Sequence, residues 1–456
     1  MTNRFKTLTE ESVLFLSILK WVTLSSGIGA IVGSATSLFL SLLSRGLSLT
    51  SYISTPYLLL PIALFFSHLI IHYLSPDSEG HGTEKVISAI HRRSGNIRFR
   101  VVPIKLIATI ITLAFGGSAG KEGPCAQIGA ALSSGIAKLF RFSKSDRKTL
   151  VICGISAGFA AVFGTPIAGA IFGVEVLFVG RLMYSVLLPS FVSGMVSYQV
   201  ASLWGVSFDQ FAIPVIPDFS LSLFLMIIFV GCIFGILSVL LIHILNWGGA
   251  WSKKLSVWPP LRGIIGGVLL IGIAEMVSPD YLGLGLHTID SVLHGQHVAW
   301  YAPLVKMITT SITLGSGGSG GILTPIFFVG VTSGAVLGDV LGLPMIAMAA
   351  IGFVSLLAGA ANTPIAACIL AVELFGSDIA PYATISCVVS FLMTGYRSVF
   401  PSQVLSIAKA PSFVVKTGQE VDDTEIHMDY QTLKKFGKGR NILKSHWKKF
   451  WKFKSD

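Results

Sequence analysis

The chain has 456 residues, of which 52% are hydrophobic and only 12% are charged, and its mean hydropathy is +0.76. Soluble globular proteins carry about 25% charged residues, so this composition excludes that class and indicates a protein embedded in a lipid bilayer. Much of the formal net charge of +11 lies in the C-terminal tail, without a nucleic-acid-binding motif. We therefore expect no nucleic-acid partner.

Long apolar stretches recur along the chain and predict an all-α polytopic membrane protein. The first, residues 13–43, is too long for a signal peptide and should remain attached. Later stretches meet or approach the ~20 residues that cross a hydrocarbon core: 56–74, 221–245, 264–277 and 379–393. Others are too short or too interrupted by Gly and Pro to cross alone: 101–115, 165–178 and 364–375. We expect at least ten membrane segments.

The cysteines lie in apolar stretches and lack the spacing of a metal site or a disulfide framework; they are Cys125, Cys153, Cys232, Cys368 and Cys387. The sequence thus predicts no metal site and no cofactor.

An internal repeat relates the interrupted segments to one another. Three motifs recur in the same order, at separations of 203, 201 and 198 residues: 75–91 with 278–294, GSAGKEGP at 117–124 with GSGGILTP at 318–325, and TPIAGAIFGVEV at 165–176 with TPIAACILAVEL at 363–374. The last pair shares seven of twelve residues, including Glu175 and Glu373. Two halves with corresponding breaks are typical of transporters whose ligand site lies where the breaks meet.

We place the first repeat at about residues 13–205 and the second at about 219–408, within one transmembrane domain of residues 1–408. An odd number of crossings in each half would invert the second half relative to the first. We favour this inverted topology.

Each Gly-rich break leads into an apolar helix. Pro124 lies at the start of the first of these helices and Pro325 at the start of the second. Proline suits the first turn of a helix. The first N–H groups of a helix have no internal partner and carry part of the positive end of the helix dipole. Glycines let the backbone approach a ligand closely, so these breaks favour a small-anion site.

Glu122 stands inside the first break, two residues before Pro124. An ionised carboxylate there would face the unpaired N–H groups of the break as a tethered anion. It could occupy the anion site when charged and leave when protonated or displaced. An ionisable residue inside a membrane is a functional candidate, and we predict that Glu122 is the gate; a static helix cap is the alternative.

Other interpretations of the breaks remain open. The glycines could serve only close helix packing. The stretch Gly317–Gly320 also fits the GxSG motif of intramembrane serine proteases, with Ser319 as nucleophile, but the histidines that follow it lie in the polar tail. A secondary transporter for another solute would share the repeats and broken helices. We expect a transporter and not an enzyme.

The motifs GKEGP at 120–124, GGILTP at 320–325 and the repeated TPIA segments closely resemble the CLC family of chloride channels and chloride/proton exchangers. The resemblance spans about residues 15–408. It implies inverted repeats in one subunit, a homodimer with one pore in each subunit, and chloride or a similar small anion as the transported ligand.

By this resemblance, Glu122 is similar to the gating glutamate. Backbone amides of the two breaks correspond to the anion-coordinating ones, and the family's GSGIP motif appears as residues 80–84, where His81 replaces its serine and Glu84 its proline. Phe400 aligns with the family's pore tyrosine. The resemblance therefore implies an anion site of His81, Gly82, Lys121, Glu122, Gly123, Ile322, Leu323 and Phe400.

Proton coupling is the open question within the family. Where exchangers carry an inner glutamate, this chain has Val176, directly after Glu175. We therefore favour a channel or a loosely proton-coupled carrier, with a tightly coupled chloride/proton antiporter as the alternative. The candidate proton-pathway residues are Glu122, Glu175 and Glu84. Pro124 is unlike the family's fluoride branch.

Residues 409–456 form a basic tail in which lysines alternate with aromatic residues. Such a tail suits an anionic cytoplasmic leaflet. We expect a multi-pass protein of the plasma or inner membrane with both termini in the cytoplasm.

Overall fold

The computed structural model describes residues 2–208, 211, 213, 215, 216, 218, 220–424 and 426–428, with side chains described from residue 10 to residue 424 within these ranges. Most of the predicted basic tail lies outside the described residues.

The helices of the first half are α1 (Thr2–Thr50), α2 (Leu60–Leu74), α3 (Gly82–Arg93), α4 (Val101–Ala114), α5 (Glu122–Leu139), α6 (Lys144–Phe163), α7 (Pro166–Glu175) and α8 (Tyr184–Leu203). Those of the second half are α9 (Leu221–Lys254), α10 (Leu261–Met276), α11 (Leu286–Leu293), α12 (Ala302–Gly315), α13 (Leu323–Leu341), α14 (Met345–Ala361), α15 (Pro364–Phe375) and α16 (Ala380–Met393). The all-α prediction is confirmed.

Short 3-10 helices occur in the connections: η1 (Pro56–Leu59), η2 (Pro76–Ser78), η3 (Pro279–Tyr281), η4 (Ser377–Ile379) and η5 (Val421–Asp423). The few strands form two small sheets. Strand β1 (Phe178–Val179) pairs in parallel with β2 (Val404–Leu405), and β3 (Phe413–Val415) pairs antiparallel with β4 (Ile426–Met428).

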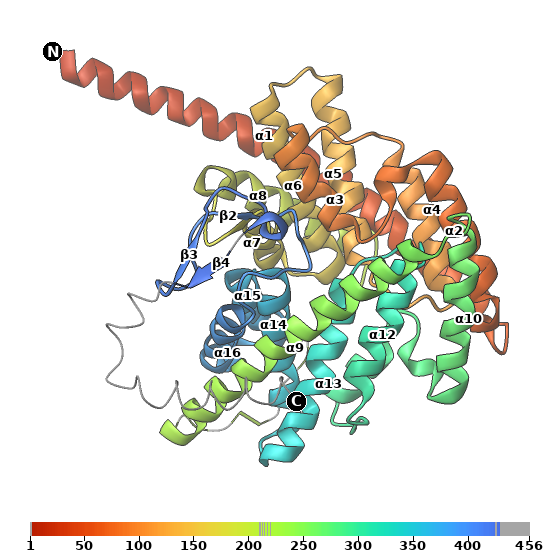
Figure 1. Ribbon diagram of the computed structural model, residues 1–456. Coiled ribbons are helices and arrows are strands. Elements are labelled where there is room, and N and C mark those ends of the chain that lie inside the picture. The colour runs from red at the N-terminus through yellow and green to blue at the C-terminus, as the bar shows by residue number, and fades with distance from the viewer. Residues whose placement is uncertain are drawn as a thin grey trace.

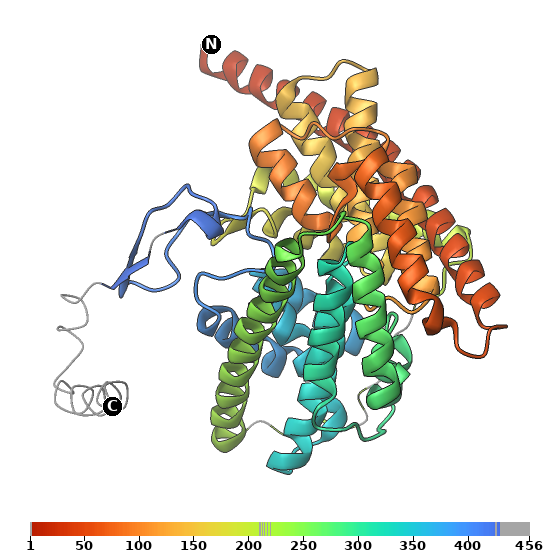
Figure 2. The same ribbon diagram turned by 45° about the vertical axis from the view of Figure 1, so that its right-hand side comes forward.

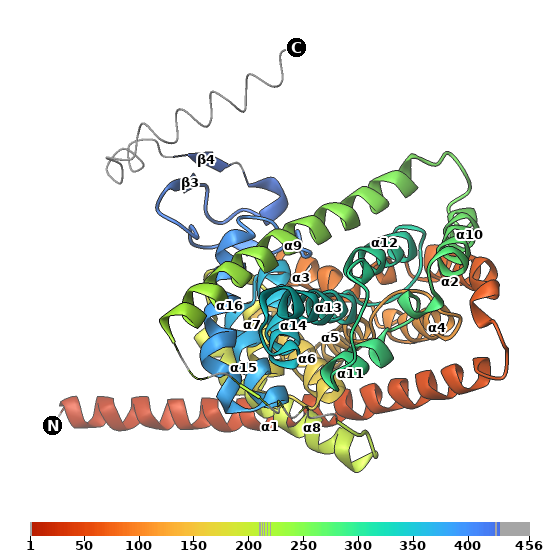
Figure 3. The same ribbon diagram turned by 90° about the horizontal axis from the view of Figure 1, so that it is seen from below.

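The two halves lie side by side, with the first-half helices in red to yellow above the second-half helices in green to blue (Figures 1 and 2). The N-terminal end of α1 projects from the body, and its apolar side chains between residues 13 and 19 are exposed (Figures 1 and 3). Among the described residues, five helices are long and apolar enough to cross a membrane: residues 10–50, 56–74, 184–203, 221–254 and 323–341. Shorter apolar helices account for the interrupted segments.

Close helix packing uses glycines at corresponding positions of the two halves. A Cβ on Gly129 of α5 would overlap the carbonyl oxygen of Gly154 of α6. A Cβ on Gly330 of α13 would likewise overlap that of Gly352 of α14. Some glycines of the repeat therefore serve packing alone, and they are separate from the glycines of the breaks.

The long helix of each half that precedes a TPIA motif ends in a left-handed residue. Gly164 closes α6 with φ of 71°, and Asn362 closes α14 with φ of 56°. Among side-chain-bearing residues, asparagine tolerates this conformation better than most. Asn362 is therefore the substitute for glycine at the second site, and its amide also donates to the Gln403 side chain over 3.1 Å.

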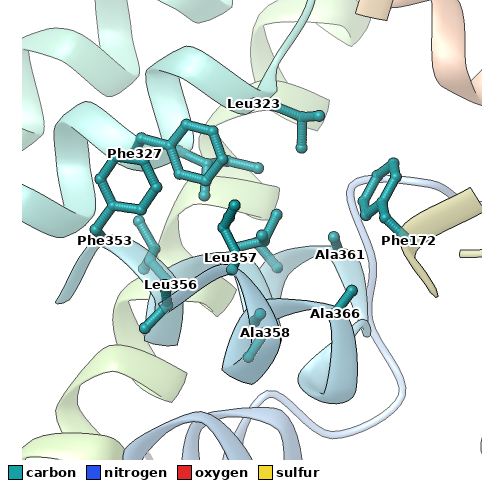
Figure 4. Packing of buried hydrophobic residues seen from close by; sticks show 14 of the residues in the cluster. Phe172, Leu323, Phe327, Phe353, Leu356, Leu357, Ala358, Ala361 and Ala366 are labelled. Atoms are coloured by element: carbon teal, nitrogen blue, oxygen red, sulfur yellow. The ribbon is translucent and has the colours of Figure 1, made fainter. Parts of the chain in front are cut away.

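The core between the halves is apolar and tightly packed around α13, α14 and α15 (Figure 4). Phe327 of α13 stacks on Phe353 of α14, with ring centroids 4.0 Å apart and planes 9° apart. Phe172 of α7 reaches the same cluster from the first half. This packing joins the first turn of α13, directly after the second break, to the core of both halves.

The packed chain continues past residue 408. Residues 400–424, which we call the C-terminal segment, pair with β1 through β2 and return over α3. Lys409 within this segment donates to the Asn362 side chain over 2.6 Å and to the Phe391 carbonyl over 2.7 Å. The C-terminal segment is thus part of the folded body.

Candidate functional site

The two Gly-rich breaks are in direct contact. The Gly120 N–H donates to the Gly321 carbonyl over 2.7 Å, and the Gly321 N–H donates to the Gly120 carbonyl over 2.6 Å. These glycines occupy the same position of the repeat, 201 residues apart. A residue that pairs mutually with its own counterpart lies on a local two-fold axis. The breaks therefore meet at the axis that relates the halves.

Hydroxyl groups extend the same reciprocal pattern around the axis. The Ser118 N–H donates to the Thr313 hydroxyl over 3.0 Å, and the Ser319 N–H donates to the Thr112 hydroxyl over 3.0 Å. All four residues are buried. Each half thus uses a threonine to satisfy a backbone donor in the break of the other half, which a buried break requires.

Three helix N-termini converge at the breaks: those of α3, α5 and α13. A Cβ on Gly82 would overlap the Gly123 carbonyl oxygen, and a Cβ on Gly123 would lie 2.9 Å from the Gly321 Cα. Glycine is required here because backbone meets backbone. The structure thus brings together the backbone of the predicted anion-site residues Gly82, Lys121, Gly123, Ile322 and Leu323.

Glu122 is the first residue of α5 and only 1% exposed. Its carboxylate accepts the Thr324 hydroxyl, at 2.6 and 2.7 Å from the two oxygens, and the Thr324 N–H at 3.2 Å. The sequence suggested that this carboxylate would face the N–H groups of its own break. It instead caps α13 of the other half, because the glycine contact brings the two helix starts within reach of one side chain.

A cavity of 390 Å³ borders Glu122. Its lining includes Lys121, Glu122 and Thr324 from the breaks, and His287 and Asp290 from α11. Glu122 therefore stands between the point where the breaks meet and a space large enough for water and ions.

A second cavity of 230 Å³ borders His81, with Val399, Asn246 and Lys253 also in its lining. The rings of His81 and Phe400 are 5.7 Å apart and inclined by 53°. His81 also bridges in parallel to Gly320 of the second break. His81 and Phe400, which the family resemblance assigns to the anion site, are thus neighbours, and we call their ring contact the inner constriction.

The two cavities share no lining residue. The Glu122 cavity is lined by residues of α5, α6, α11, α13, α14 and α15 together with Ser207, Phe208 and Phe211, whereas the His81 cavity is lined mainly by α9 and α12. Residues at the converging helix starts therefore border two separate cavities.

Sequence reasoning missed a pair of buried lysines beside the breaks. Lys105 of α4 donates to the Gly80 carbonyl over 2.6 Å, and Lys306 of α12 donates to the Gly283 carbonyl over 2.9 Å. Both lysines are 0% exposed. They are repeat counterparts, 201 residues apart in apolar segments, and that spacing could have revealed them. Each holds the loop that leads into α3 or α11.

Glu175 and Glu373 form reciprocal helix caps. The Glu175 carboxylate accepts the N–H groups of Ile365 and Ala366 at 3.0 and 2.7 Å. The Glu373 carboxylate accepts those of Ile167 and Ala168, also at 3.0 and 2.7 Å. A glutamate in the last turn of each helix, α7 or α15, thus caps the N-terminus of the other helix.

The proton-pathway candidates do not form one group. Both oxygens of Glu175 are engaged in the cap of α15, whereas the carboxylate of Glu122, on α5, caps α13. Glu84 belongs to the His81 side, where its two oxygens accept the Ser402 N–H at 3.2 and 3.3 Å. A carboxylate is therefore available near each cavity, with Glu175 tied to helix structure.

Ser319 does not have the surroundings of a nucleophile. Its hydroxyl is 2.9 Å from the Thr109 hydroxyl, and the residue is 0% exposed. A serine nucleophile requires a base within hydrogen-bond reach, and the described hydrogen bonds of Ser319 run to threonines. Within the described ranges there is also no cluster of three or more His, Cys, Asp or Glu side chains that could hold a metal ion.

Comparison with known proteins gives one consistent group. The family described as voltage gated chloride channel matches residues 62–395. A chloride/fluoride channel protein of Pseudomonas syringae pv. tomato is 36% identical over 407 residues, covering 88% of this chain and 90% of that protein. A voltage-gated ClC-type chloride channel of Shigella flexneri is 27% identical over 313 residues, covering 66% of this chain and 74% of that protein.

Solved structures share the arrangement of helices. A CLC-type fluoride/proton antiporter superposes with a TM-score of 0.82 at 28% identity, covering 86% of this chain and 99% of that one. A slow cyanobacterial chloride/proton antiporter superposes with a TM-score of 0.72 at 19% identity, covering 82% of this chain and 94% of that one.

Proposed function

Because the chain belongs to the voltage-gated chloride channel family, and is therefore an anion-transporting membrane protein and not an enzyme, we propose that it carries fluoride as well as chloride and that Glu122 gates their passage. The observation that carries the proposal is the Glu122 carboxylate itself. It caps the N-terminus of α13 at the edge of the 390 Å³ cavity. A small anion that displaces it would meet the same donors.

Fluoride is included on two grounds. One relative, at 36% identity, bears the name chloride/fluoride channel protein, and one structural neighbour is a fluoride/proton antiporter. The pathway also offers the Thr324 hydroxyl and the His81 imidazole as hydrogen-bond donors. A small, strongly hydrated anion loses more on leaving water and needs such donors more. Pro124 favours chloride instead, so the proposal names both anions.

We propose channel-like or loosely proton-coupled transport. Glu175 is tied to the N-terminus of α15, and Val176 beside it cannot carry a proton. A second candidate is exchange of the anion for protons at a constant ratio, which the likeness to a fluoride/proton antiporter favours.

The experiment that separates them uses purified protein in liposomes loaded with fluoride or chloride. Ion-selective electrodes record anion efflux, a pH electrode records proton movement, and a protonophore serves as control. Our proposal expects efflux of both anions and no uphill proton movement at a constant ratio. Proton uptake in constant proportion to the anion would establish the second candidate, and absence of efflux for both anions would overturn the function.

The orientation follows from the charges of the loops. The loops beside the Glu122 cavity, residues 204–220 and 277–301, contain no Lys or Arg. The connections on the His81 side, residues 94–100 and 139–148, contain Arg98, Arg100, Arg141, Lys144, Arg147 and Lys148. Cytoplasmic loops carry an excess of Lys and Arg. We infer that the His81 cavity opens to the cytoplasm, with both chain termini on that side of the plasma or inner membrane.

We also infer a homodimer in the bilayer. The family resemblance implies two subunits with one pore in each, and the isolated chain exposes apolar side chains along α1, α8, α9 and α16. Lipid and a second copy of the chain would share these faces. The mass of the purified protein, measured by light scattering with the detergent contribution subtracted, tests this inference, and a monomer would contradict it.

A further inference from the structure

The C-terminal segment is held against α3 at both ends of that helix. In the first turn of α3, Glu84 accepts the Ser402 N–H at 3.2 and 3.3 Å. In the last turn, the Arg92 guanidinium donates to both carboxylate oxygens of Glu420, with its Nε at 2.7 Å from one of them. The Arg92–Glu420 pair is exposed, whereas Glu84 is largely buried. Water therefore screens the first contact more strongly than the second.

Glu84 is linked to the inner constriction by a short path. Its partner Ser402 follows Phe400 by two residues, in a turn where the Phe400 N–H donates to the Ser398 hydroxyl over 3.0 Å. The Phe400 ring lies 5.7 Å from that of His81, the residue that precedes α3. The two residues of the inner constriction thus come from the two segments that Glu84 joins: His81 precedes α3, and Phe400 lies in the turn that carries Ser402.

The charges around Glu84 are few. On α3 itself they are Lys85 and Arg92, and on the C-terminal segment there is Glu420. Helix α5, which packs on the start of α3, presents the uncharged Gln127. The pKa of Glu84 is raised to about 7, chiefly by burial and in smaller part by Glu420, while the hydrogen bonds from Ser402 and the charge of Lys85 act against the rise. The proton occupancy of Glu84 therefore changes near neutral pH.

At the far end of α3, His91 lies 3.0 Å from the Leu177 carbonyl, and Lys148 of α6 faces it. These groups are two helical turns from Glu84. The titratable groups in contact with the turn that carries Phe400 are then Glu84, through Ser402, and His81, through the Phe400 ring.

We propose that Glu84 is a positioning residue of the inner gate: its ionised carboxylate holds the Phe400 turn against His81, and a proton on it loosens this hold. A hydrogen bond to a charged acceptor is about twice as strong as one to a neutral acceptor. Acid on the His81 side therefore opens the inner constriction. The inference rests on the proposed anion pathway, and the first test below does not depend on transport.

The first test places a reporter cysteine at Val399, which is 5% exposed and lines the His81 cavity. Its rate of modification by a water-soluble thiol reagent is measured at pH 6 and pH 8.5, after subtraction of the labelling of the parent chain. Three backgrounds are compared: native Glu84, Glu84→Gln and Glu79→Gln. Glu79 is an exposed carboxylate five residues earlier and is the matched control.

Glutamine keeps an acceptor oxygen for the Ser402 N–H but stays neutral, so it imitates the protonated carboxylate at every pH. At pH 8.5 the cysteine should react roughly fivefold faster in Glu84→Gln than in the native background, the factor expected from losing the charge on one hydrogen bond. At pH 6 the two backgrounds should react alike. The Glu79→Gln background should match the native one at both pH values.

Equal rates with Glu84 and Glu84→Gln at pH 8.5 would overturn the proposal. So would an equal acceleration by Glu79→Gln, because a general change in surface charge would then explain it. Thiol ionisation cancels in each comparison, since both rates are taken at the same pH.

A second test uses anion efflux in the Glu122→Gln background, which removes the outer carboxylate. Efflux in this background should still rise severalfold between pH 8.5 and pH 6. Adding Glu84→Gln should hold efflux at its acid level throughout, and Glu84→Asp should restore a pH response. A pH response that survives in the Glu122→Gln, Glu84→Gln double variant would overturn the proposal without affecting the function proposed for the chain.

Discussion

Two contacts between the halves place a buried carboxylate on the N-terminus of a helix, and they differ in symmetry. Between α7 and α15 the contact is reciprocal, since Glu175 and Glu373 cap each other's helices at the same distances. Between α5 and α13 it runs one way. Glu122 caps α13, but its repeat counterpart, 201 residues on, is Leu323, which has no charge to return.

The symmetric contact has the features of a structural joint and the asymmetric one those of a working site. Both oxygens of Glu175 accept backbone N–H groups at a helix start. The shortest hydrogen bonds of Glu122 come from a side-chain hydroxyl that can rotate, and a 390 Å³ cavity lies beside it. Function in this chain is expected where the repeat symmetry is broken, and the following predictions test that rule.

The largest effect is expected from Glu122→Gln. Without a carboxylate that can leave and return with its proton, efflux should lose the part of its pH dependence that Glu122 provides, a change of about tenfold for each pH unit over which one protonation controls opening. Halide efflux from liposomes, recorded as a function of pH, measures it. The matched control is Glu175→Gln, which should keep the native profile, and a native profile in Glu122→Gln would place the gate elsewhere.

Folding stability, unlike gating, should depend on the symmetric contact between α7 and α15. Glu175→Ala leaves two buried N–H groups at the start of α15 without acceptors, and the expected loss is about 2–4 kcal/mol of folding free energy. Glu373→Ala should also destabilise the protein, but by less, because its two hydrogen bonds are more exposed to solvent than those of Glu175. Thermal unfolding of the purified variants in detergent gives the comparison. A large loss for one variant and none for the other would show that the joint is not symmetric in energy.

Thr324→Val should have a smaller effect, on gating alone. The variant keeps the shape of the side chain but removes the hydroxyl donor at 2.6 Å from Glu122. The ionised gate then loses a hydrogen bond worth roughly 1.5–3 kcal/mol, so the midpoint of efflux against pH should move upward by about one unit or more. Thr332→Val, a buried threonine farther along α13 whose hydroxyl bonds to its own helix, is the control and should leave the midpoint in place.

The smallest effect is expected outside the two joints, at the exposed ion pair of Arg92 and Glu420. The hydrogen bond from Arg92 lowers the pKa of Glu420, so the pair stabilises the fold above the unfolded-state pKa of about 4.3, and this stabilisation is lost as the pH falls through the lowered pKa of the folded state. An exposed pair is worth under about 1 kcal/mol. The difference in thermal midpoint between native protein and Glu420→Gln should be small at pH 7 and shrink as acid protonates Glu420; a difference that grows in acid would contradict this account.

The repeat made much of the fold predictable, because Gly and Pro breaks are local signals and each appears twice. It also pointed to Glu122 and to the backbone at Gly123 and Leu323, since helix starts are visible in the sequence. Thr324 as the partner of Glu122 was not predictable. Which helix start a side chain reaches depends on how closely the two breaks pack, and that distance is a tertiary property.

Other parts were hidden for different reasons. Lys105 and Lys306 had a usable signal in the sequence, their matching positions in the two halves. A single lysine in an apolar segment does not, however, indicate which carbonyl groups it contacts. The contact between Glu84 and Ser402 joins residues 318 positions apart, and nothing local marks it. The binding roles assigned to His81, Phe400 and the amides of the breaks stay predictions until an anion is measured at them.

The mutual pairing of Gly120 with Gly321 has an evolutionary consequence. Two identical chains that associate about a two-fold axis make such a contact between copies of one residue. A half-length ancestor could therefore have assembled the same breaks as an antiparallel dimer. In that dimer every substitution would have appeared on both sides of the axis, so that a glutamate gate and an apolar counterpart could not coexist. Joining two such copies into one chain would remove this constraint, and the pair of Glu122 and Leu323 at equivalent positions is an asymmetry that only a joined chain allows.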